Sequence, residues 1–450
     1  MSEDQILDEI EQNKSEYITF FQELIKTESY NPPGNEKNVA FVIEKYLKKS
    51  GLKPEIFPFG DNRANLIVYL NNKFDGKTLL FNGHMDVVPP GNEEEWKYPP
   101  LSATIKRKKY LYGRGTTDMK GGLAAMIIAL KILKKLKLHL SGNLILNAVA
   151  DEETGGDKGT KWCMDHILNS IKPDFAIISE PTRLKPLPHV ISIGERGRLV
   201  VKLITNGIST HSSWPFMGKN AIYMMSEIIH NLDRIDEYIP KIRPPLSIEE
   251  LKKLMSEAFP SLEILEKIIN EQPILNSILK ALTQFTKSLT IIKGGIKDNV
   301  VPDRCEAIID FRLLPGQEIE PILNAIRKLV EVDLGYSVKS EPSGDPQEVF
   351  VYIENIQYSE PSYWKDWDKS STLKRFYKIV EKVHNKKPFY FLYPASADAS
   401  HLRNGAYCTE TIMFGPGSGA SAHSIDEYIE IEDFIDAIKI YTLFAYDYLK

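Results

Sequence analysis

The amino-acid sequence predicts an α/β fold in which a mixed sheet, flanked by helices, is interrupted by a smaller α+β domain. Short apolar runs typical of buried strands alternate with segments of helical spacing from residue 65 to residue 178. Such alternation is typical of a sheet with helices on both faces. A different order of strands and helices begins after Ile191, and the first pattern returns near Pro361.

The first domain begins with helices and continues into the sheet. Apolar positions at helical spacing span residues 5–50, and the turn sequence Asn31-Pro32-Pro33-Gly34 interrupts them. We then expect strands and helices in alternation: strands at 66–70, 78–81, 144–149 and 175–178, and helices from residue 120 and over 161–169.

The second domain has a pattern of its own. Its expected elements are strands at 199–205, 288–292 and 305–312, helices at 220–232 and 318–332, and a proline-bounded helical insertion at 236–287. The C-terminal segment carries His423, which we expect to complete the site described below. Residues 1–195 and 361–450 are therefore predicted to form one domain, with residues 196–360 inserted into it.

Composition excludes several classes of protein. A chain of 450 residues is too long for one ordinary core, which agrees with two domains. The net charge of −5 and the absence of a basic stripe give no reason to expect nucleic-acid binding. The three cysteines lie far apart in the sequence and form neither a disulfide framework nor a cysteine zinc site. No apolar run reaches the roughly 18 residues of a membrane span, and no secretory signal is evident, so we expect a cytoplasmic protein without membrane partners.

Residue types that bind metals stand where the apolar runs end. They occur at four such places: His84, the pair Glu152 and Glu153, Glu180 and, after a glycine-rich loop, His423. Ligands bind at the carboxyl ends of the strands in open α/β sheets. The sequence therefore predicts one site, formed by four strand ends, for two metal ions.

Neighbouring residues refine this site. Asp118 stands just before a helix, where it either caps the helix N-terminus or bridges two cations about 3.5–4 Å apart, and we favour the bridge. Asp86 lies on the same side of an extended strand as His84, so its carboxylate is expected to accept the second imidazole N–H. Of the adjacent Glu152 and Glu153, one can bind metal while the other acts as general base.

Motifs of a known enzyme family recur in order from residue 83 to the C-terminus. They are Gly83-His84-Met85-Asp86-Val87-Val88-Pro89, Gly113-Arg114-Gly115 with Asp118-Met119-Lys120-Gly121-Gly122, Asp151-Glu152-Glu153, Ser179-Glu180-Pro181-Thr182, Thr210-His211-Ser212-Ser213, Asn299-Val300-Val301-Pro302, and Gly415-Pro416-Gly417 with Ala422-His423. On these motifs the chain resembles the co-catalytic zinc metallohydrolases and metallopeptidases. That family includes acetylornithine deacetylase, succinyl-diaminopimelate desuccinylase, aminoacylase and glutamate carboxypeptidase.

The resemblance implies two zinc ions, for which Co²⁺ or Mn²⁺ can substitute. It places His84, Asp118 and Glu180 on one ion, and Asp118, Glu153 and His423 on the other. It further implies that Glu152 is the general base, that Asp86 orients His84, and that a cis peptide bond follows Asp118.

The resemblance also assigns residues of the inserted domain. His211 would reach the active site of a partner subunit and stabilise the oxyanion, so we expect a homodimer. The inserted domain, of ferredoxin-like type, would then serve as both lid and dimerisation domain. Asn299 and Arg312 resemble residues that hold the carboxylate of the substrate. Arg312 alternates with Asp310 along a strand, so a structural ion pair is the alternative for that residue.

The implied activity is removal of an acyl group from a small N-acyl amino acid with a free carboxylate, as in acetylornithine deacetylase and succinyl-diaminopimelate desuccinylase. A carboxypeptidase, dipeptidase or aminoacylase that acts on short peptides or acylated amino acids is the alternative, which the insertion at 236–287 favours. The third possibility is an inactive homologue that only binds its ligand. The presence of all five metal ligands and the base argues against it. We find no Gly-x-Ser-x-Gly elbow, and His401 is expected behind the metal ligands at best.

Overall fold

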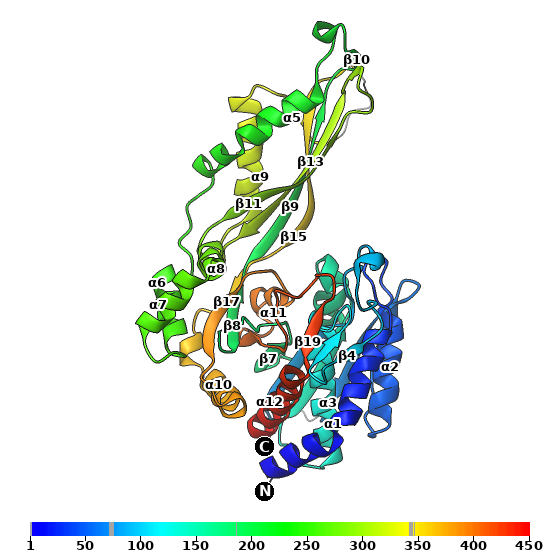
Figure 1. Ribbon diagram of the computed structural model, residues 1–450, viewed down its shortest axis with the longest axis vertical. Helices are drawn as coiled ribbons and strands as arrows, with labels where there is room; N and C mark the ends of the chain where they lie inside the picture. Colours follow the sequence, from blue (N-terminus) through cyan, green and yellow to red (C-terminus); the bar gives the residue numbers. More distant parts are fainter. Residues whose placement is uncertain (1, 72–75, 186, 342–344, 346) are drawn as a thin grey trace.

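The computed structural model describes residues 2–71, 76–185, 187–341, 345 and 347–450. It has two lobes, each built on a sheet of its own (Figure 1). The larger sheet has nine strands, and β17 (Phe389–Tyr393) pairs with β8 beside the main path. The order along that path is β1 (Glu55–Phe59), β2 (Arg63–Tyr69), β6 (Asn143–Val149), β3 (Thr78–His84), β7 (Phe175–Ile178), β18 (Thr411–Met413), β8 (Val190–Glu195) and β16 (Ser362–Tyr363). The predicted mixed α/β class is confirmed.

The four central strands β6, β3, β7 and β18 run parallel to one another. Their side chains alternate between two buried apolar clusters, because helices cover both faces of the sheet. Leu79 and Phe81 belong to one cluster, and Leu80 belongs to the cluster on the other face. This double burial explains why the strands appear in the sequence as continuous apolar runs. Parallel strands also bring their carboxyl ends to the same edge of the sheet.

Helices from both ends of the chain cover the first face. α12 (Ile431–Leu449) packs against α3 (Lys120–Lys135), α1 (Ser2–Lys26) and α10 (Ser371–His384). The other helices of this lobe are α2 (Glu36–Lys48), α4 (Trp162–His166) and α11 (Ala399–Asn404). The N- and C-terminal segments of the chain therefore lie side by side in one lobe (Figure 1).

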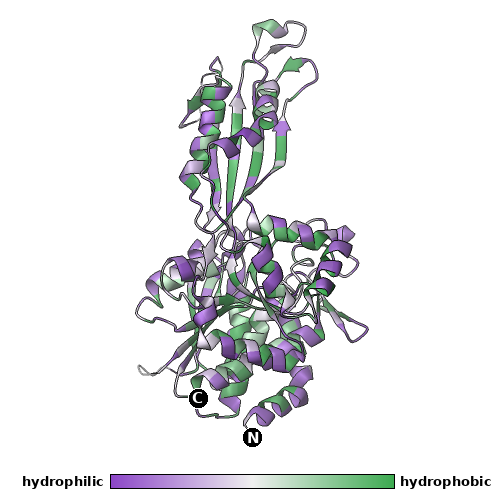
Figure 2. Ribbon diagram, turned by 90° about the vertical axis from the view of Figure 1, so that its left-hand side faces the viewer, coloured by the Kyte–Doolittle hydropathy of each residue, from purple (hydrophilic) through white to green (hydrophobic). Residues whose placement is uncertain are grey.

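The smaller sheet has the order β11 (Thr286–Gly294), β13 (Arg304–Leu313), β9 (Gly197–Asn206), β15 (Phe350–Ser359) and β14 (Val338–Lys339). All of these strands lie between residues 197 and 359. Along β13 every second side chain is buried, since α5 (Ala221–His230) and α9 (Ile319–Lys328) cover only one face of this sheet. Figure 2 shows hydrophobic residues along the strands of both sheets and polar residues on the outer helix surfaces.

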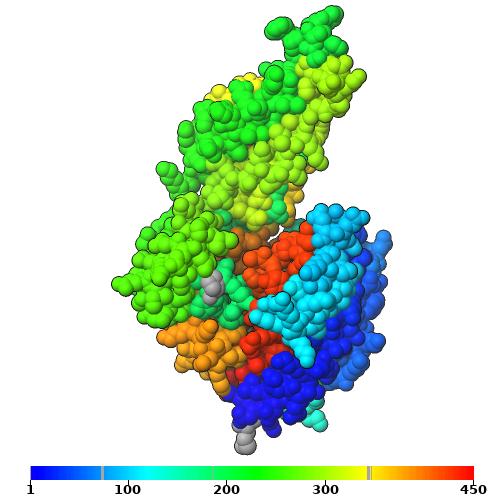
Figure 3. Space-filling view, in the orientation of Figure 1, coloured from blue at the N-terminus to red at the C-terminus, as the bar shows by residue number. Residues whose placement is uncertain are grey.

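The helical insertion expected within the second domain forms α6 (Ile248–Ser256), α7 (Leu262–Glu271) and α8 (Pro273–Thr283). Its packing differs from that expectation. The buried residues of these helices belong to the main apolar cluster of the larger lobe, and α6 contacts β17. In the space-filling view the segment lies beside α10 (Figure 3). The amphipathic helices bury their apolar faces against the larger lobe, although the chain enters and leaves them from the smaller one.

Some boundaries differ from those expected. Only Trp162–His166 of the segment 161–169 is α-helical, after an irregular turn at Asp157–Lys161. Two small sheets were not expected: one of β19 (Tyr428–Glu430), β5 (Tyr110–Tyr112) and β4 (Thr104–Lys106), and one of β10 (Thr210–His211) and β12 (Val300–Val301). Within the described ranges, no helix is both long and apolar enough to cross a membrane.

Candidate metal centre

The parallel strands bring the predicted residues to one edge of the larger sheet. His84 is the last residue of β3 and is fully buried. Glu180 follows β7 by two residues, and Glu152 opens a short helical turn after β6. The loop that carries His423 crosses the end of β7 at Gly415, where a Cβ atom would lie 2.2 Å from the Ser179 carbonyl oxygen. Only glycine permits this close approach.

Asp118 lies between the two histidines. Its Oδ1 is 3.1 Å from His84 Nε2, and its Oδ2 is 3.2 Å from His423 Nε2. Glu153 Oε2 lies 3.2 Å from the same nitrogen of His423, and Glu180 Oε1 lies 3.7 Å from His84 Nε2. Each oxygen of Asp118 thus faces a different group of ligand atoms, as a bridging carboxylate requires. The peptide bond after Asp118 is cis, as the resemblance implied.

The donor atoms are spaced for metal binding. One ligand atom from each of His84, Asp118 and Glu153 lies within 4.8 Å of the others, and the same holds for His84, Glu152 and Glu180. In the described part of the chain, the buried Oε1 atoms of Glu153 and Glu180 have no hydrogen-bond partner. Buried polar atoms of this kind are destabilising unless they are satisfied. A cation satisfies them, and nitrogen and oxygen donors suit Zn²⁺, so these residues fit the expected metals.

The acids of the cluster are strongly perturbed. Burial raises the pKa of Glu152 and of Glu180 well above the usual value, and the negative charge of neighbouring carboxylates adds to the rise. Burial likewise raises the pKa of Glu153, and the charge of Asp118 acts in the same direction. So many carboxylates hold their protons when they share one buried site, unless positive charge is supplied.

The two histidines counteract this effect of burial at Asp118. Burial alone would raise the pKa of Asp118, but hydrogen bonds from His423 and His84 hold it below the usual range. Hydrogen bonds to Asp118 and Glu153 raise the pKa of His423 to about 10. The site therefore attracts cations at the two positions that the imidazoles face.

Asp86 orients His84 differently from the expectation. His84 Nδ1 lies 2.8 Å from the main-chain oxygen of Asp86, whereas the nearest carboxylate oxygen is 3.6 Å away. The carboxylate instead accepts hydrogen bonds from Asn31 Nδ2 at 2.8 Å and from the N–H groups of Glu152 and Glu153 at 3.3 and 3.2 Å. Asp86 thus holds the imidazole through its main chain and the turn of the two glutamates through its side chain.

A cavity of about 130 Å³ lies over these residues and is closed on one side by the smaller lobe. Arg312 and Arg198 line it from β13 and β9, where they lie opposite each other. Each Nε is 2.7 Å from a carboxylate oxygen of Asp310. Arg312 therefore forms the ion pair considered above and also faces the cavity. The sequence did not predict a role for Arg198. Its place in the cavity becomes evident only from its position opposite Arg312 on the neighbouring strand.

His211 and Asn299 lie elsewhere. They come together at the far tip of the smaller lobe, where β10 pairs with β12 and Ser212 N–H donates to the Asn299 carbonyl at 3.0 Å (Figure 1). Neither residue lines the cavity that holds the predicted metal ligands of the same chain. His401 does line this cavity, with its Nε2 atom 3.2 Å from the carbonyl oxygen of Gly155.

Two further histidines pack against each other outside the predicted metal centre. The rings of His189 and His384 stack with centroids 3.3 Å apart, and the His384 side chain is 7% exposed. The three cysteines are all buried and free.

Buried histidines and carboxylates at the ends of parallel strands, around a cavity, define a metal-dependent enzyme. The chain belongs to peptidase family M20/M25/M40, whose family model matches residues 80–447. It is accordingly a metal-dependent hydrolase that acts on amide or peptide bonds. A probable succinyl-diaminopimelate desuccinylase of Staphylococcus aureus (strain MSSA476) is 30% identical over 442 residues, which cover 97% of this chain and 98% of the relative.

Solved structures share the whole architecture. The dipeptidase Dug1p of Saccharomyces cerevisiae has a TM-score of 0.79 at 18% identity and covers 99% of this chain and 98% of its own. The M20 metallo-carboxypeptidase Sso-CP2 of Sulfolobus solfataricus has a TM-score of 0.77 at 23% identity and covers 96% of this chain and 99% of its own. At these identities the likeness supports the fold.

Proposed function

We propose that this chain is a dinuclear zinc-dependent amide hydrolase that removes an acyl group from an N-acyl amino acid, in the manner of acetylornithine deacetylase and succinyl-diaminopimelate desuccinylase. The observation that carries the proposal is Asp118, whose two oxygens face His84 and His423 separately. Glu180 Oε1 and Glu153 Oε1 have no hydrogen-bond partner among the described residues, which supports one ion beside Glu180 and a second ion beside Glu153. The full-length similarity to a probable desuccinylase supports a deacylase.

The reaction needs a positioned base. Two zinc ions held by the residues above would lower the pKa of water and polarise the amide carbonyl. The side chain of Glu152 lines the cavity, with its Oε2 atom 3.8 Å from His84 Nε2. It takes the proton of the attacking water and returns it to the leaving amine. The main-chain N–H of Glu152 donates a hydrogen bond to the carboxylate of Asp86. This bond fixes the position of the Glu152 side chain relative to the metal ligands.

The carboxylate of the substrate is assigned to the arginines of the cavity. Arg312 and Arg198 each form an ion pair with Asp310 through Nε, so two guanidinium groups share one carboxylate. The local charge is therefore positive. Guanidinium groups bind carboxylates through paired N–H donors. A substrate carboxylate placed here would leave its amide directed at the metal ligands on the opposite wall.

A peptidase is the alternative, and the space around the site favours it. A groove of about 740 Å³ adjoins the smaller cavity and shares five lining residues with it: Gly155, Gln357, Ser359, Ser400 and His401. This groove has room for the leaving residue of a dipeptide or for a longer chain. A carboxypeptidase, dipeptidase or aminoacylase would use the same ligands and the same base.

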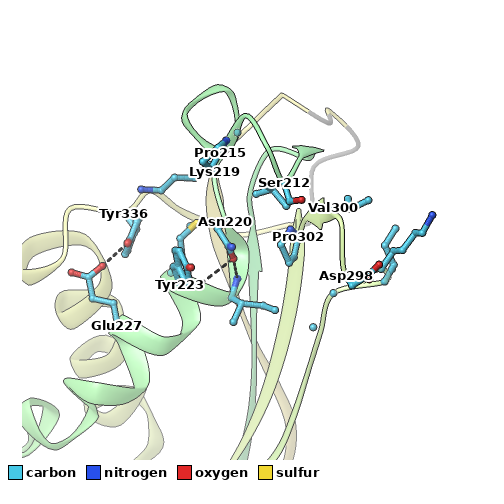
Figure 4. Close-up of a pocket in the computed structure, with 18 residues that line it drawn as sticks. Ser212, Pro215, Lys219, Asn220, Tyr223, Glu227, Asp298, Val300, Pro302 and Tyr336 are labelled. Atoms are coloured by element: carbon cyan, nitrogen blue, oxygen red, sulfur yellow. Dashed lines mark hydrogen bonds between the residues drawn. The ribbon is translucent and has the colours of Figure 1, made fainter.

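The expected homodimer is part of the proposal. A second copy of the chain would be needed to bring His211 to the cavity, where it would donate to the oxyanion. Beside His211 the tip carries a groove of about 870 Å³, lined by residues such as Ser212, Asn220 and Tyr223 (Figure 4). The neighbouring side chains of Phe216 and Ile296 are 100% and 87% exposed. Apolar exposure of this extent favours contact with another protein surface.

The cytoplasmic location stays a prediction.

The test is release of free amine by protein reconstituted with Zn²⁺ or Co²⁺. The panel contains N-acetyl and N-succinyl amino acids, N-acetylornithine, succinyl-diaminopimelate and dipeptides with a free C-terminus, with Glu152→Gln protein as the matched blank. Turnover of one acylated amino acid supports the deacylase, and turnover of peptides alone supports the alternative. Wild-type protein that binds no metal contradicts both.

A further inference from the structure

Glu427 is a buried carboxylate that holds the segment leading to Asp118. Its Oε2 accepts hydrogen bonds from Arg114 Nη1 at 2.8 Å and from the N–H of Gly115 at 3.1 Å. Its Oε1 accepts hydrogen bonds from the N–H groups of Thr117 and Asp118 at 2.8 and 3.1 Å. The Glu427 side chain is fully buried. Four donors of one loop thus converge on an acid that comes from the far end of the chain.

Arg114 completes the connection from the other side. Its Nη1 donates to the carbonyl of Ser424 at 3.2 Å, and its Nη2 lies 3.5 Å from the carbonyl of His423. The guanidinium also lies over the ring of Trp96, 5.0 Å from the centroid. The arginine is therefore fixed on several sides while it bonds both the acid and the main chain of the His423 loop.

His423 depends on this connection more than the other predicted ligands do. His84, Glu153 and Glu180 come directly from the ends of central strands, whereas His423 lies in a loop with a left-handed φ of 58°. Its side chain is 50% exposed. No strand of the larger sheet carries His423. Its loop is joined to the Asp118 loop by the pairing of β19 with β5, by Thr117 Oγ1, which donates to the carbonyl of Tyr428 at 2.7 Å, and by the hydrogen bonds of Glu427 and Arg114.

We propose that Glu427 and Arg114 are positioning residues that set the spacing between Asp118 and His423 and so determine the affinity for one of the two metal ions. Charge-assisted hydrogen bonds to main-chain groups are strong and directional. Residues behind metal ligands commonly contribute about 10- to 100-fold in metal affinity. The inference rests on the proposed dinuclear site.

A general structural role gives a different expectation. If the pair only stabilised the fold, its loss would weaken both ions together or neither. The ion held by His84, Asp118 and Glu180 has two ligands that the Glu427 connection does not touch. The ion that Asp118, Glu153 and His423 would hold has two ligands, Asp118 and His423, that the Glu427 connection positions. Selective weakening of one ion is therefore the signature of positioning.

The experiment measures both zinc affinities of Glu427→Gln by competition with a chromophoric chelator, and follows Co²⁺ loading by its visible absorption. Glu9→Gln is the matched control, since Glu9 is also buried and accepts hydrogen bonds from Tyr17 Oη at 2.9 Å and Lys135 Nζ at 2.7 Å, away from the site. We expect one ion to bind Glu427→Gln roughly 10- to 100-fold more weakly. The other ion should bind as in wild type, and Glu9→Gln should retain both affinities.

Two further comparisons keep the outcome decisive. Arg114→Lys keeps a cation opposite Glu427 but loses the reach to the His423 loop, so it should show the same selective loss even where Glu427→Gln folds poorly. Equal affinities in the variants and in wild type overturn the positioning role, and so does an equal loss at both ions. Wild-type protein that binds fewer than two ions overturns the proposed dinuclear function itself.

Discussion

Replacing Glu152 by glutamine is expected to stop turnover while the metal site stays intact. The turn that carries Glu152 is held by its main chain, because the Asp86 carboxylate binds the N–H groups of Glu152 and Glu153 at 3.3 and 3.2 Å. Glutamine has the same shape and keeps these bonds. It loses only the ability to accept a proton from water.

The magnitude follows from that single loss. General-base catalysis contributes about 10²- to 10⁴-fold, or about 2.7–5.4 kcal/mol of transition-state stabilisation. We therefore expect kcat to fall by that factor with zinc content unchanged, measured by amine release and by metal analysis of the same sample. Glu153→Gln is the contrasting variant, because Glu153 contacts His423 at 3.2 Å and should lose metal as well as activity. Glu152→Gln protein with the kcat of wild type would refute the assignment of the base.

Three further predictions concern the substrate, the metals and the fold. Arg312→Ala should lower kcat/KM for carboxylate-bearing substrates by roughly 10- to 100-fold, because a hydrogen bond to a charged group contributes about 1.5–3 kcal/mol. Steady-state kinetics measure this loss, and an uncharged analogue of the substrate is the control. Chelation should abolish activity and lower the unfolding temperature, since ions that bind only the folded state stabilise it. Burial beside His384 and Arg183 holds the pKa of His189 well below its usual range, so the folded state binds fewer protons there than the unfolded state. Stability should therefore fall as pH drops below about 6.5, by up to about 1.4 kcal/mol per pH unit, and denaturant titrations should show a weaker fall in His189→Phe.

The metal-binding edge could be predicted because it depends on local patterns. A strand buried on both faces appears in the sequence as a short apolar run, as Leu79, Leu80 and Phe81 of β3 do. A polar residue directly after such a run therefore lies at the edge of the sheet. Parallel neighbours then bring the ends of four runs together without further information.

Features that depend on packing between distant segments could not be predicted in the same way. The amphipathic spacing of α6–α8 predicts helices but does not say which lobe they cover. Arg198 reaches the cavity only through its register opposite Arg312, and that register is set by the whole length of β9 and β13. Asp86 was assigned a side-chain contact, yet it lies two residues beyond the end of β3, where its main-chain oxygen contacts His84 Nδ1 instead. Sequence spacing indicates which residues share a face, and packing decides which atoms meet.

The separation of Arg198 and His211 along the smaller lobe gives a decisive test of the expected dimer. β9 has ten residues, and at about 3.3 Å per residue it places its two ends roughly 30 Å apart. Arg198 lines the cavity at one end of β9, and His211 lies beyond the other end, on the small β10–β12 sheet at the tip of the same lobe. A tilt of the lobe within one chain moves both residues together, so it cannot bring the histidine to the cavity while the arginine stays there.

Only a second copy can then supply His211 to the metal centre, which predicts complementation between two inactive variants. His211→Ala protein keeps its Glu152, and Glu152→Gln protein keeps its His211. In randomly mixed dimers half of the molecules are heterodimers with one complete site, so about a quarter of wild-type activity should return. The mixture is prepared by joint refolding or coexpression and compared with each variant alone and with wild type treated identically. Activity that stays at the level of the separate variants, while wild type recovers fully, would show that His211 does not act across subunits.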